Sequence, residues 1–559
     1  MSPTSTSDPV LIVGAGPSGL VAALTLLRNN IPVRIIDKEP FHKSGQRGPG
    51  IHARTLELFH ILDVPEVAKV GTPVPPMRTY KPNSLEPLKT FFMSPYREPT
   101  PAIPYYNALL VGQNTLEGIL RSHLEKFSCN VELGTELRSL EQHPDYIVVR
   151  LAKKQGDEEI EETFETKWLI GTDGAKGVTR KQLALTFSGE TREEARILTG
   201  DIRLTGKGID RKHWHIFGDS QSGTVVLRPT NELGEDGFQF VAAGRDVDVP
   251  KLAGSKEELF KFISSTIDTE IEFNELIWSS EFRPNIRVAN KFSEGRVFIA
   301  GDAAHVHSPT GGQGLNSSVQ DSFNLCWKLA LVYKGLAPAS LLESYTTERL
   351  PVIAEMLNIT TEILDKTMNL TRFTADSAFV RTQRMNMLGV NYRTSPIVLN
   401  EVTTDAEPVA AYGLVQDGVL LAGDRARDAP ALVDVKSVSQ EVTTRLFDVF
   451  RTSYHTVLIF AQDAAKILTI VSTLKQYEAV VRSAVVLPAT TSVESALSMG
   501  VDSADMVLLD REGHAYNGYL IKADETRVVI VRPDGVVGGV VFGEEGAVKY
   551  FKGILGSQA

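Results

Sequence analysis

The distribution of hydrophobic residues divides the chain into stretches of different type. Residues 10–13 and 33–36 are short, continuous apolar runs, a pattern typical of strands buried on both faces of a parallel sheet. Residues 20–28, which lie between them, have helical spacing. Continuous runs recur at 168–170 and 296–300, and each is soon followed by a glycine next to an aspartate. The pattern predicts a doubly wound α/β sheet assembled from distant parts of the chain.

The stretch between the last two runs has a different pattern. Residues 213–217, 224–228 and 238–242 are typical of strands in a mainly antiparallel sheet. Ser255 and Glu258 form a capping box, which predicts that one helix begins there. We therefore predict that a sheet domain is inserted, in sequence, into the α/β domain.

Helices and a second set of strands are predicted after residue 301. One helix is expected from about residue 317 to 334, closed by Gly335, and helical sequence continues past Met368. Residues 392–413, which include Pro396 and Pro408, are typical of a linker. Further strands are predicted at 456–460, 484–487, 506–509, 528–531 and 540–542, the last two joined by a turn at 533–535.

These patterns predict an α/β fold in four segments. Residues 1–182 form the first part of a doubly wound, Rossmann-like domain, and residues 183–284 form an inserted, mainly antiparallel sheet domain that binds substrate. Residues 285–395 return to the first domain and add helices, and residues 410–559 form a separate small α/β domain.

Composition narrows the classes of partner. The 559 residues carry a formal net charge of −11 with no long basic run, so we expect no nucleic-acid partner. The two cysteines, Cys129 and Cys326, cannot form a disulfide framework or a cysteine-rich metal site. Residues 1–8 do not resemble a secretory signal, and no segment approaches the roughly 20 apolar residues of a membrane helix. We expect a cytoplasmic protein with no membrane span and no metal.

The N-terminal sequence VLIVGAGPSGL contains a dinucleotide-binding fingerprint. Gly14 permits a tight turn, Gly16 lets a pyrophosphate approach the backbone, and Gly19 lets helix and strand pack closely. Pro17 and Ser18 begin the helix whose free N–H groups face the phosphates. Asp37 ends the second strand, where a carboxylate can accept hydrogen bonds from ribose hydroxyls. This unit alone does not distinguish FAD from NAD.

Two further motifs make that distinction through a resemblance. LIGTDG at 169–174 and RVFIAGDAAH at 296–305, together with the first fingerprint, resemble the class A flavoprotein aromatic hydroxylases, the family of para-hydroxybenzoate hydroxylase and phenol hydroxylase. The resemblance implies FAD as cofactor and NADPH or NADH as co-substrate. It also implies that Asp173 lies near the groove shared by FAD and the nicotinamide, and that Asp302 holds a ribityl hydroxyl.

Other segments extend the same resemblance. HSPTGGQGLN at 307–316 is similar to the loop over the flavin ring, and a helix beginning near Leu315 would direct N–H groups at the N1–C2=O side of the flavin. GIHARTLE at 50–57 resembles the phosphate-side segment. The further cofactor contacts that the resemblance implies are Lys38, Arg47, Arg54, Gln113, Leu137 through its backbone, Pro309, Gly312, Gly314, Leu315 and Asn316.

The C-terminal segment resembles the thioredoxin-like domain of the phenol hydroxylase and aromatic polyketide hydroxylase branch. The similarity rests on LLDREGHAY at 508–516 and VRPDG at 531–535. No cysteine lies in this segment, so dithiol redox chemistry is excluded there. A structural role, or support of a homodimer, is expected instead.

The substrate site is less well defined by the sequence. Phenol hydroxylase has an aspartate where this chain has Pro49, so a phenol-activating base must come from elsewhere or the substrate must bind already activated. His213, His215 and Arg228 are the candidate catalytic residues. The two histidines share one face of a strand, where sheet packing is the more expected role and a metal site is poorly supported.

The resemblance implies a monooxygenase that hydroxylates a small phenolic substrate with O2 through a C4a-hydroperoxyflavin. If the attacked carbon of a hydroxybenzoate bears a carboxylate, the same chemistry gives oxidative decarboxylation. A flavin-dependent dehydrogenase, reductase or halogenase, without oxygen insertion, is the alternative. A non-enzymatic binding module of the same fold should lack the second and third acid-glycine motifs, and this chain has both.

Overall fold

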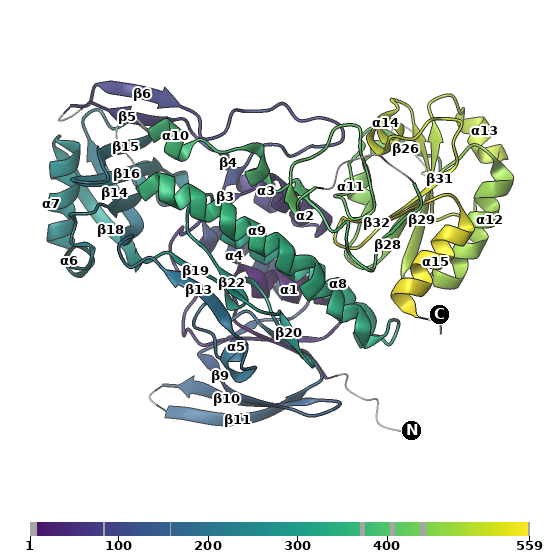
Figure 1. The fold of residues 1–559 in the computed structure, drawn as a ribbon, viewed down its shortest axis with the longest axis horizontal. Coiled ribbons are helices and arrows are strands. Elements are labelled where there is room, and N and C mark those ends of the chain that lie inside the picture. The colour runs from purple at the N-terminus through teal and green to yellow at the C-terminus, as the bar shows by residue number, and fades with distance from the viewer. Residues whose placement is uncertain are drawn as a thin grey trace.

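The computed structural model describes residues 8–81, 84–156, 158–368, 375–402, 409–436 and 443–556 (Figure 1). A C-terminal lobe lies at one end of the molecule, and a lobe built on an antiparallel sheet lies at the other. The long helix α9 (Glu343–Met368) runs across the middle. None of the described helices is long and apolar enough to cross a membrane.

The central sheet confirms the prediction of a doubly wound α/β fold. Its six strands run in the order β20-β21-β12-β1-β2-β8, and all neighbours are parallel except the edge strand β20. All four residues of β1 are buried, which explains the continuous apolar run in the sequence. The strands are β1 (Val10–Val13), β2 (Val33–Asp37), β8 (Val131–Leu133), β12 (Leu169–Gly171), β20 (Ser293–Glu294) and β21 (Val297–Ile299).

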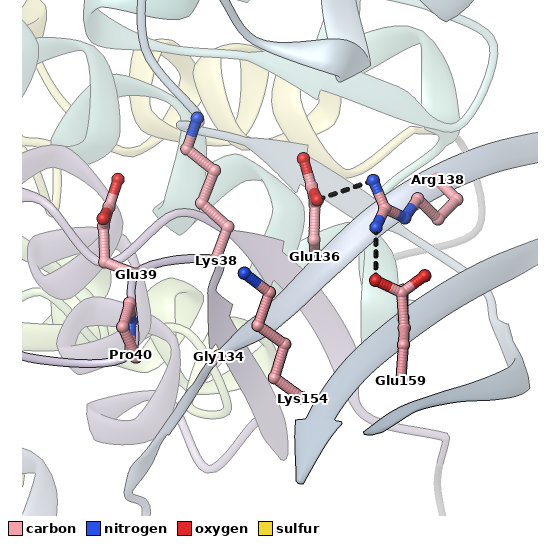
Figure 2. Close-up of a pocket in the computed structure, with 9 residues that line it drawn as sticks. Lys38, Glu39, Pro40, Gly134, Glu136, Arg138, Lys154 and Glu159 are labelled. Carbon is pink, nitrogen blue, oxygen red and sulfur yellow. Dashed lines mark hydrogen bonds and ion pairs between the residues drawn. The ribbon is translucent and has the colours of Figure 1, made fainter. Parts of the chain in front are cut away.

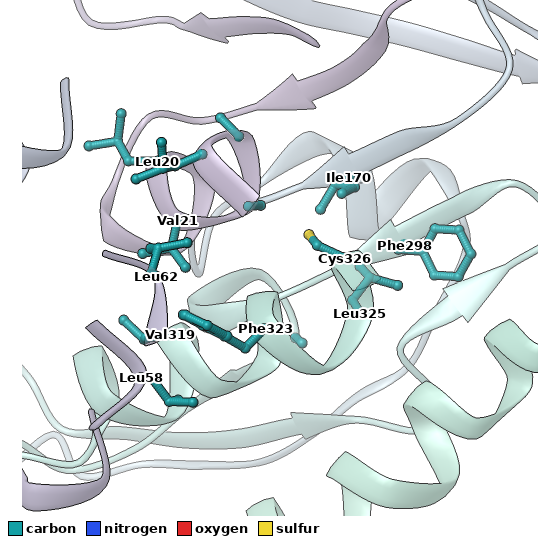
Figure 3. Packing of buried hydrophobic residues seen from close by; sticks show 14 of the residues in the cluster. Leu20, Val21, Leu58, Leu62, Ile170, Phe298, Val319, Phe323, Leu325 and Cys326 are labelled. Carbon is teal, nitrogen blue, oxygen red and sulfur yellow. The ribbon is translucent and has the colours of Figure 1, made fainter. Parts of the chain in front are cut away.

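Two helices next to this sheet form the largest core. Helix α1 (Pro17–Arg28) packs against α8 (Gly314–Tyr333), and Figure 3 shows Leu20 and Val21 of α1 in one cluster with Val319 and Phe323 of α8. Helix α8 begins three residues before the predicted start, and Gly335 lies just beyond its end with a φ of +69°. Helix α4 (Gln113–Glu125) covers α1 on another side.

A three-stranded antiparallel sheet packs on the other face of the central sheet. It comprises β9 (Thr135–Gln142), β10 (Ile147–Gln155) and β11 (Glu158–Thr166). Leu137 and Leu151 of this small sheet share a buried cluster with Leu11 of β1.

The inserted sheet is mainly antiparallel, as predicted, but it is not confined to residues 183–284. Its order is β18-β14-β17-β16-β15-β5-β6, and its last two strands come from the chain before residue 100. Those strands, β5 and β6, join through a parallel pairing of β5 with β15. The seven strands are β5 (Met77–Tyr80), β6 (Pro87–Phe91), β14 (Ile197–Gly206), β15 (Trp214–Asp219), β16 (Gly223–Pro229), β17 (Gly237–Ala243) and β18 (Ile271–Phe282).

Helices α6 (Val249–Gly254) and α7 (Lys256–Ile267) cover one face of this sheet. Ser255 caps α7 as predicted, because its hydroxyl accepts from Glu258 N at 3.2 Å. The Glu258 carboxylate pairs with Lys251 at 2.9 Å instead of returning to the cap, so half of the predicted capping box forms.

The C-terminal lobe is a second α/β unit with strands at all the predicted positions. Its sheet has the order β24-β32-β31-β28-β29-β30-β26-β27, and α12 (Ala464–Leu474) and α15 (Glu544–Leu555) cover one face. The thioredoxin-like assignment stays a prediction. The strands are β24 (Leu399–Asn400), β26 (Leu432–Asp434), β27 (Thr443–Thr444), β28 (His455–Phe460), β29 (Val481–Pro488), β30 (Met506–Asp510), β31 (Arg527–Val531) and β32 (Val537–Val541).

The predicted linker at 392–413 is partly structured. Strand β24 joins the edge of the C-terminal sheet, and β25 (Tyr412–Gly413) pairs with β23 (Gly389–Val390). Pro408 lies outside the described residues. The remaining elements are α2 (Ala53–Ile61), α3 (Glu66–Val70), α5 (Val178–Gln182), α10 (Ala375–Phe379), α11 (Leu446–Val449), α13 (Val493–Ser498), α14 (His514–Tyr519), β3 (Gly50–Ile51), β4 (Thr72–Pro73), β7 (Leu109–Leu110), β13 (Phe187–Thr191), β19 (Asn285–Ala289) and β22 (His305–Val306).

Candidate cofactor and substrate site

Three turns that are distant in sequence meet at one edge of the central sheet. They follow β1, β12 and β21, which are adjacent parallel strands, so their carboxyl ends lie together. Thr172 donates from its N to Val13 O at 2.7 Å and from its Oγ1 to Gly14 O at 2.7 Å. A Cβ added to Gly301 would lie 3.2 Å from Ser18 Cβ. The convergence predicted for the three acid-glycine motifs is present.

The three glycines of the first turn have different surroundings. Gly14 has a φ of +104°, and a Cβ there would lie 2.4 Å from Thr172 O. A Cβ on Gly19 would lie 2.0 Å from Gly14 O, so helix α1 and the turn need glycine to pack. A Cβ on Gly16 would meet no protein atom within 4 Å. Gly16 therefore faces open space at the N-terminus of α1, and this space fits a pyrophosphate.

Asp37 and Asp173 each brace a turn. Asp37 accepts from Ala15 N at 2.8 Å and from Glu39 N at 2.9 Å. Asp173 accepts from the N and Oγ1 of Thr179 at 2.9 and 3.0 Å, and its other oxygen is enclosed without a partner. Burial raises the pKa of Asp173 above its ordinary value. An unpartnered, enclosed oxygen beside the glycine turn fits a position that a ligand group completes.

Asp302 is the exposed acid of the third turn. Its side chain is open to solvent, yet it lies deep enough among protein atoms that burial raises its pKa. The neighbouring Gly301 N donates to Asp321 Oδ2 at 3.0 Å, so Asp321 holds the turn and leaves the Asp302 carboxyl facing the open space. Such a carboxyl fits a hydroxyl-bearing ligand chain.

The predicted flavin-ring loop ends at the N-terminus of α8. Pro309 and Gly312 are exposed, and Gly314 and Leu315 are half-buried at the first turn of the helix. The Asn316 side chain is fully used within the protein: Oδ1 accepts from His52 N at 2.8 Å, and Nδ2 donates to Gly50 O and Gly312 O. Only backbone N–H groups of this turn remain available to a cofactor.

Two residues that the sequence analysis did not identify, His52 and Gln313, contact this loop through hydrogen bonds. Gln313 is buried, donates from Nε2 to Gly311 O at 2.8 Å, and accepts from Tyr412 OH at 2.5 Å. The His52 Nε2 lies 3.0 Å from Gly311 O. Burial lowers the pKa of His52 to about 4, so its ring is neutral at physiological pH. No spacing rule links position 52 to position 313, and only the folded chain brings them together.

Arg54 is held by contacts within the protein. Its guanidinium pairs with Glu57 at 3.0 Å and donates to Asp534 O and Gly535 O, each at 3.0 Å. The flavin contact expected of Arg54 stays a prediction. The side chain joins α2 to the turn between β31 and β32, because carbonyls presented by the C-terminal lobe satisfy the buried cation.

Three of the remaining predicted cofactor contacts lie in different parts of the fold. Gln113, at the start of α4, donates from its side chain to Glu117 Oε1 at 2.8 Å. Arg47 is exposed and lies over the Trp278 ring at 4.9 Å. The Leu137 side chain points into a core, so only its backbone could reach a ligand.

Lys38 lines a cavity of about 300 Å³ directly after β2 (Figure 2). Its wall mixes charges of both signs, and Arg138 is held between Glu136 and Glu159 at 2.8 and 2.7 Å. The lining residues are Lys38, Glu39, Pro40, Gly134, Glu136, Arg138, Ala152, Lys154 and Glu159.

The candidate catalytic residues lie on opposite faces of the inserted sheet. His215 is buried on the face toward α7, where it stacks with Tyr80 and Phe217. His213 lies 2.8 Å from Asp210 Oδ1. Both histidines are therefore part of the sheet packing. Among the described residues, no group of three or more histidine, cysteine, aspartate or glutamate side chains is arranged to hold a metal ion.

Arg228 lies on the opposite face, which bears Trp214, Ile216 and Val226 and is called the inner face below. It donates from Nε to Gln239 Oε1 at 3.1 Å and from Nη2 to Gln46 Oε1. Gln46 N donates to Asp201 Oδ2 at 2.9 Å, and the other Asp201 oxygen is enclosed without a partner. Burial lowers the pKa of Arg228 to about 10. Gln46 and Asp201 belong to no motif, and their role was not visible in the sequence.

Known proteins match most of the chain. Residues 7–360 match the FAD binding domain family. A flavin-dependent monooxygenase of Mycobacteroides abscessus is 35% identical over 465 residues, which are 81% of this chain and 89% of that protein. Pentachlorophenol 4-monooxygenase of Sphingobium chlorophenolicum is 30% identical over 83% of this chain and 82% of its own length.

Solved structures share the whole fold. The flavin-dependent monooxygenase PieE, in complex with FAD and substrate, has a TM-score of 0.80 at 22% identity and covers 98% of both chains. Aklavinone-11 hydroxylase, with FAD and aklavinone, has a TM-score of 0.77 at 22% identity over 99% of both chains. The likeness extends from the glycine turns to the end of the C-terminal lobe.

Proposed function

Because this chain belongs to the FAD binding domain family and is a flavin-dependent monooxygenase, we propose that it hydroxylates a phenolic aromatic substrate with O2 and NADPH or NADH. The observation that supports this most strongly is the meeting of three turns around an open space at Gly16, beside the enclosed oxygen of Asp173. Its cofactor is FAD.

The residues around the turns would divide the work of holding FAD. The N-terminus of α1 would take the pyrophosphate, Asp37 the adenosine ribose, and Asp302 a hydroxyl of the ribityl chain. The N-terminus of α8 would stabilise negative charge on the edge of the flavin ring. When bound, FAD would supply the redox centre that takes electrons from the nicotinamide and activates oxygen.

The inner face of the inserted sheet would bind the aromatic ring. Trp214, Ile216 and Val226 give this face apolar side chains, and Arg228 lies in the same row. An apolar wall excludes water and fixes the orientation of the ring, which are the contributions the protein can make to oxygen insertion.

The test follows reductant, oxygen and product together. The purified protein, loaded with FAD, is given NADPH or NADH with a panel of phenols, hydroxybenzoates, halogenated phenols and polycyclic phenolic ketones. A product heavier by one oxygen atom supports hydroxylation. Replacement of a carboxyl by a hydroxyl supports oxidative decarboxylation. Stoichiometric peroxide without any oxygenated product over the whole panel would contradict the proposal and favour a dehydrogenase or reductase.

We propose a separate role for each segment of the chain. Residues 1–182 and 285–395 form the FAD-binding domain, 183–284 supply most of the substrate-binding sheet, and 410–559 form a supporting domain. A cytoplasmic homodimer is the expected form. Size-exclusion chromatography with light scattering would contradict the dimer if it gave a monomer mass.

A further inference from the structure

Arg381 is a buried cation that has no anionic partner among the described residues, and its guanidinium lies over the Phe379 ring at 5.9 Å. Only 9% of the residue is exposed. Its backbone N donates to Met93 O and its Nη1 to Ala378 O, both at 2.7 Å. The Nε is enclosed without a partner, and Nη2 donates to none of the described residues. No carboxylate of the described chain forms an ion pair with it.

Two other buried guanidinium groups each have an anionic partner. Arg349 pairs with Asp321 at 2.7 Å, and Arg532 pairs with Glu348 at 2.7 Å. A buried charge that lacks a partner costs several kcal/mol, so proteins keep one where a ligand completes it. Burial lowers the pKa of Arg381 to about 10, which still leaves the group charged at physiological pH.

The position of Arg381 joins the inner sheet face to the flavin-ring loop. Ala378 and Phe379, just before it, pack with Ile216 and Val226 of the inner face, and Figure 1 shows α10 beside β15. The backbone N of Arg381 donates to Met93 O at 2.7 Å, and Met93 packs with the same apolar cluster as Ile216 and Val226.

The segment after Arg381 passes directly over the loop. A Cβ on Gly311 would lie 2.4 Å from Met385 Cε, and Gln313 Nε2 donates to Met385 O at 3.2 Å. Arg381 thus belongs to a strap of chain, residues 378–388, that lies against the inner sheet face at Ala378 and against the flavin-ring loop at Met385.

We propose that Arg381 binds the negatively charged oxygen of the aromatic substrate, and that the enzyme takes substrates which bind as oxyanions. This inference rests on the proposed function. A fixed positive charge favours the ionised form of a phenol beside it, so the O–H bond breaks on binding and the proton leaves to solvent. The guanidinium would thereby replace the base that is missing at Pro49.

Binding of three nitroaromatic probes to the FAD-loaded enzyme tests the proposal. 4-Nitrophenol changes its absorption on ionisation, 4-nitrobenzoate carries a carboxylate, and 4-nitroanisole is a neutral analogue. We expect the wild type to bind nitrophenol as the phenolate, with its pKa lowered. Arg381→Met should weaken phenolate binding at least about tenfold and change nitroanisole binding less than about twofold. Arg381→Lys should bind the phenolate with an affinity between those of the wild type and Arg381→Met.

Arg482→Met is the matched control, since Arg482 is an exposed arginine of the C-terminal lobe, and it should bind all probes like the wild type. Loss of nitrobenzoate binding in Arg381→Met shows that the site accepts carboxylates as well, and unchanged nitrobenzoate binding restricts it to phenolates. The melting temperature of Arg381→Met should stay level or rise, because methionine removes an uncompensated charge.

Two results would overturn the proposal. One is phenolate binding by Arg381→Met that equals the wild type. The other is a wild type that binds neither charged probe more tightly than nitroanisole. A lower melting temperature with equal weakening of all three probes would assign Arg381 a structural role and also reject it. Failure of the proposed function is separate, because it would appear as a wild type that makes no oxygenated product.

Discussion

Gly14 and Gly16 are two residues apart, and a methyl group has different consequences at each. At Gly14 it meets Thr172 O at 2.4 Å on a backbone with a φ of +104°, so Gly14→Ala should lower the stability of the apo-protein by more than about 1–2 kcal/mol. At Gly16 no protein atom is near, so Gly16→Ala should leave apo stability within about 1 kcal/mol and weaken FAD binding. Denaturant unfolding of the apo-protein and FAD titration measure the two effects.

Gly14→Ala and Gly16→Ala serve as controls for each other. If both variants lose apo stability equally, the space at Gly16 is not open in the folded protein. If Gly16→Ala binds FAD like the wild type, the pyrophosphate does not approach that residue.

At the residue scale, the sequence predicted backbone roles better than side-chain directions. The glycines and acids of the three turns lie where the motifs place them, because strand ends and tight turns are set locally. Arg54 turns toward the C-terminal lobe, and the carbonyls that attract it come from residues 534 and 535. Arg381 belongs to no motif, and its lack of an ion pair with any described carboxylate is visible only in the fold.

At the scale of elements, buried parallel strands were predictable and edge strands were not. β1 and β2 are continuous apolar runs because both faces are covered. β5 and β6 are short, β6 is largely exposed, and they join a sheet whose other strands follow more than 100 residues later. Such non-local pairing leaves no periodic signal.

Helices α8 and α9 and the β31–β32 turn are joined by one buried carboxylate. Glu348 lies 2.8 Å from Lys328 and 2.7 Å from Arg532. Burial alone would raise the pKa of Glu348, but these two cations hold it well below its ordinary range. Glu348→Gln leaves two buried cations short of an anion, so we expect a loss of about 3–5 kcal/mol in the free energy of unfolding. Denaturant titration measures this loss.

Glu362→Gln, on the exposed side of the same helix, is the matched control and should stay within about 0.5 kcal/mol of the wild type. A Glu348→Gln variant as stable as Glu362→Gln would show that the ion network does not hold the C-terminal lobe in place.

At the scale of the whole molecule, three histidines with lowered pKa values link folding to pH. Burial lowers the pKa values of His52 and His307 to about 4, and that of His455 to about 3. Each folded pKa lies below the unfolded value of about 6.5, so the unfolded state binds more protons as the pH falls. The stability that each neutral ring contributes is complete above pH 6.5 and is lost progressively below it, by about 2 kcal/mol at pH 5.

His455 is suited to testing this effect because it lies in the C-terminal lobe, among Trp327, Tyr550 and Phe551. Neither of its ring nitrogens has a hydrogen-bond partner among the described residues. His455→Leu should change the free energy of unfolding little at pH 8, yet gain about 2 kcal/mol on the wild type by pH 5. The variant must be compared with the wild type at each pH, because the raised pKa of Asp173 stabilises the folded state of both proteins as the pH falls. If the difference in unfolding free energy between His455→Leu and the wild type is the same at pH 8 and pH 5, the prediction is wrong. His455 would then take up its proton within the folded C-terminal core.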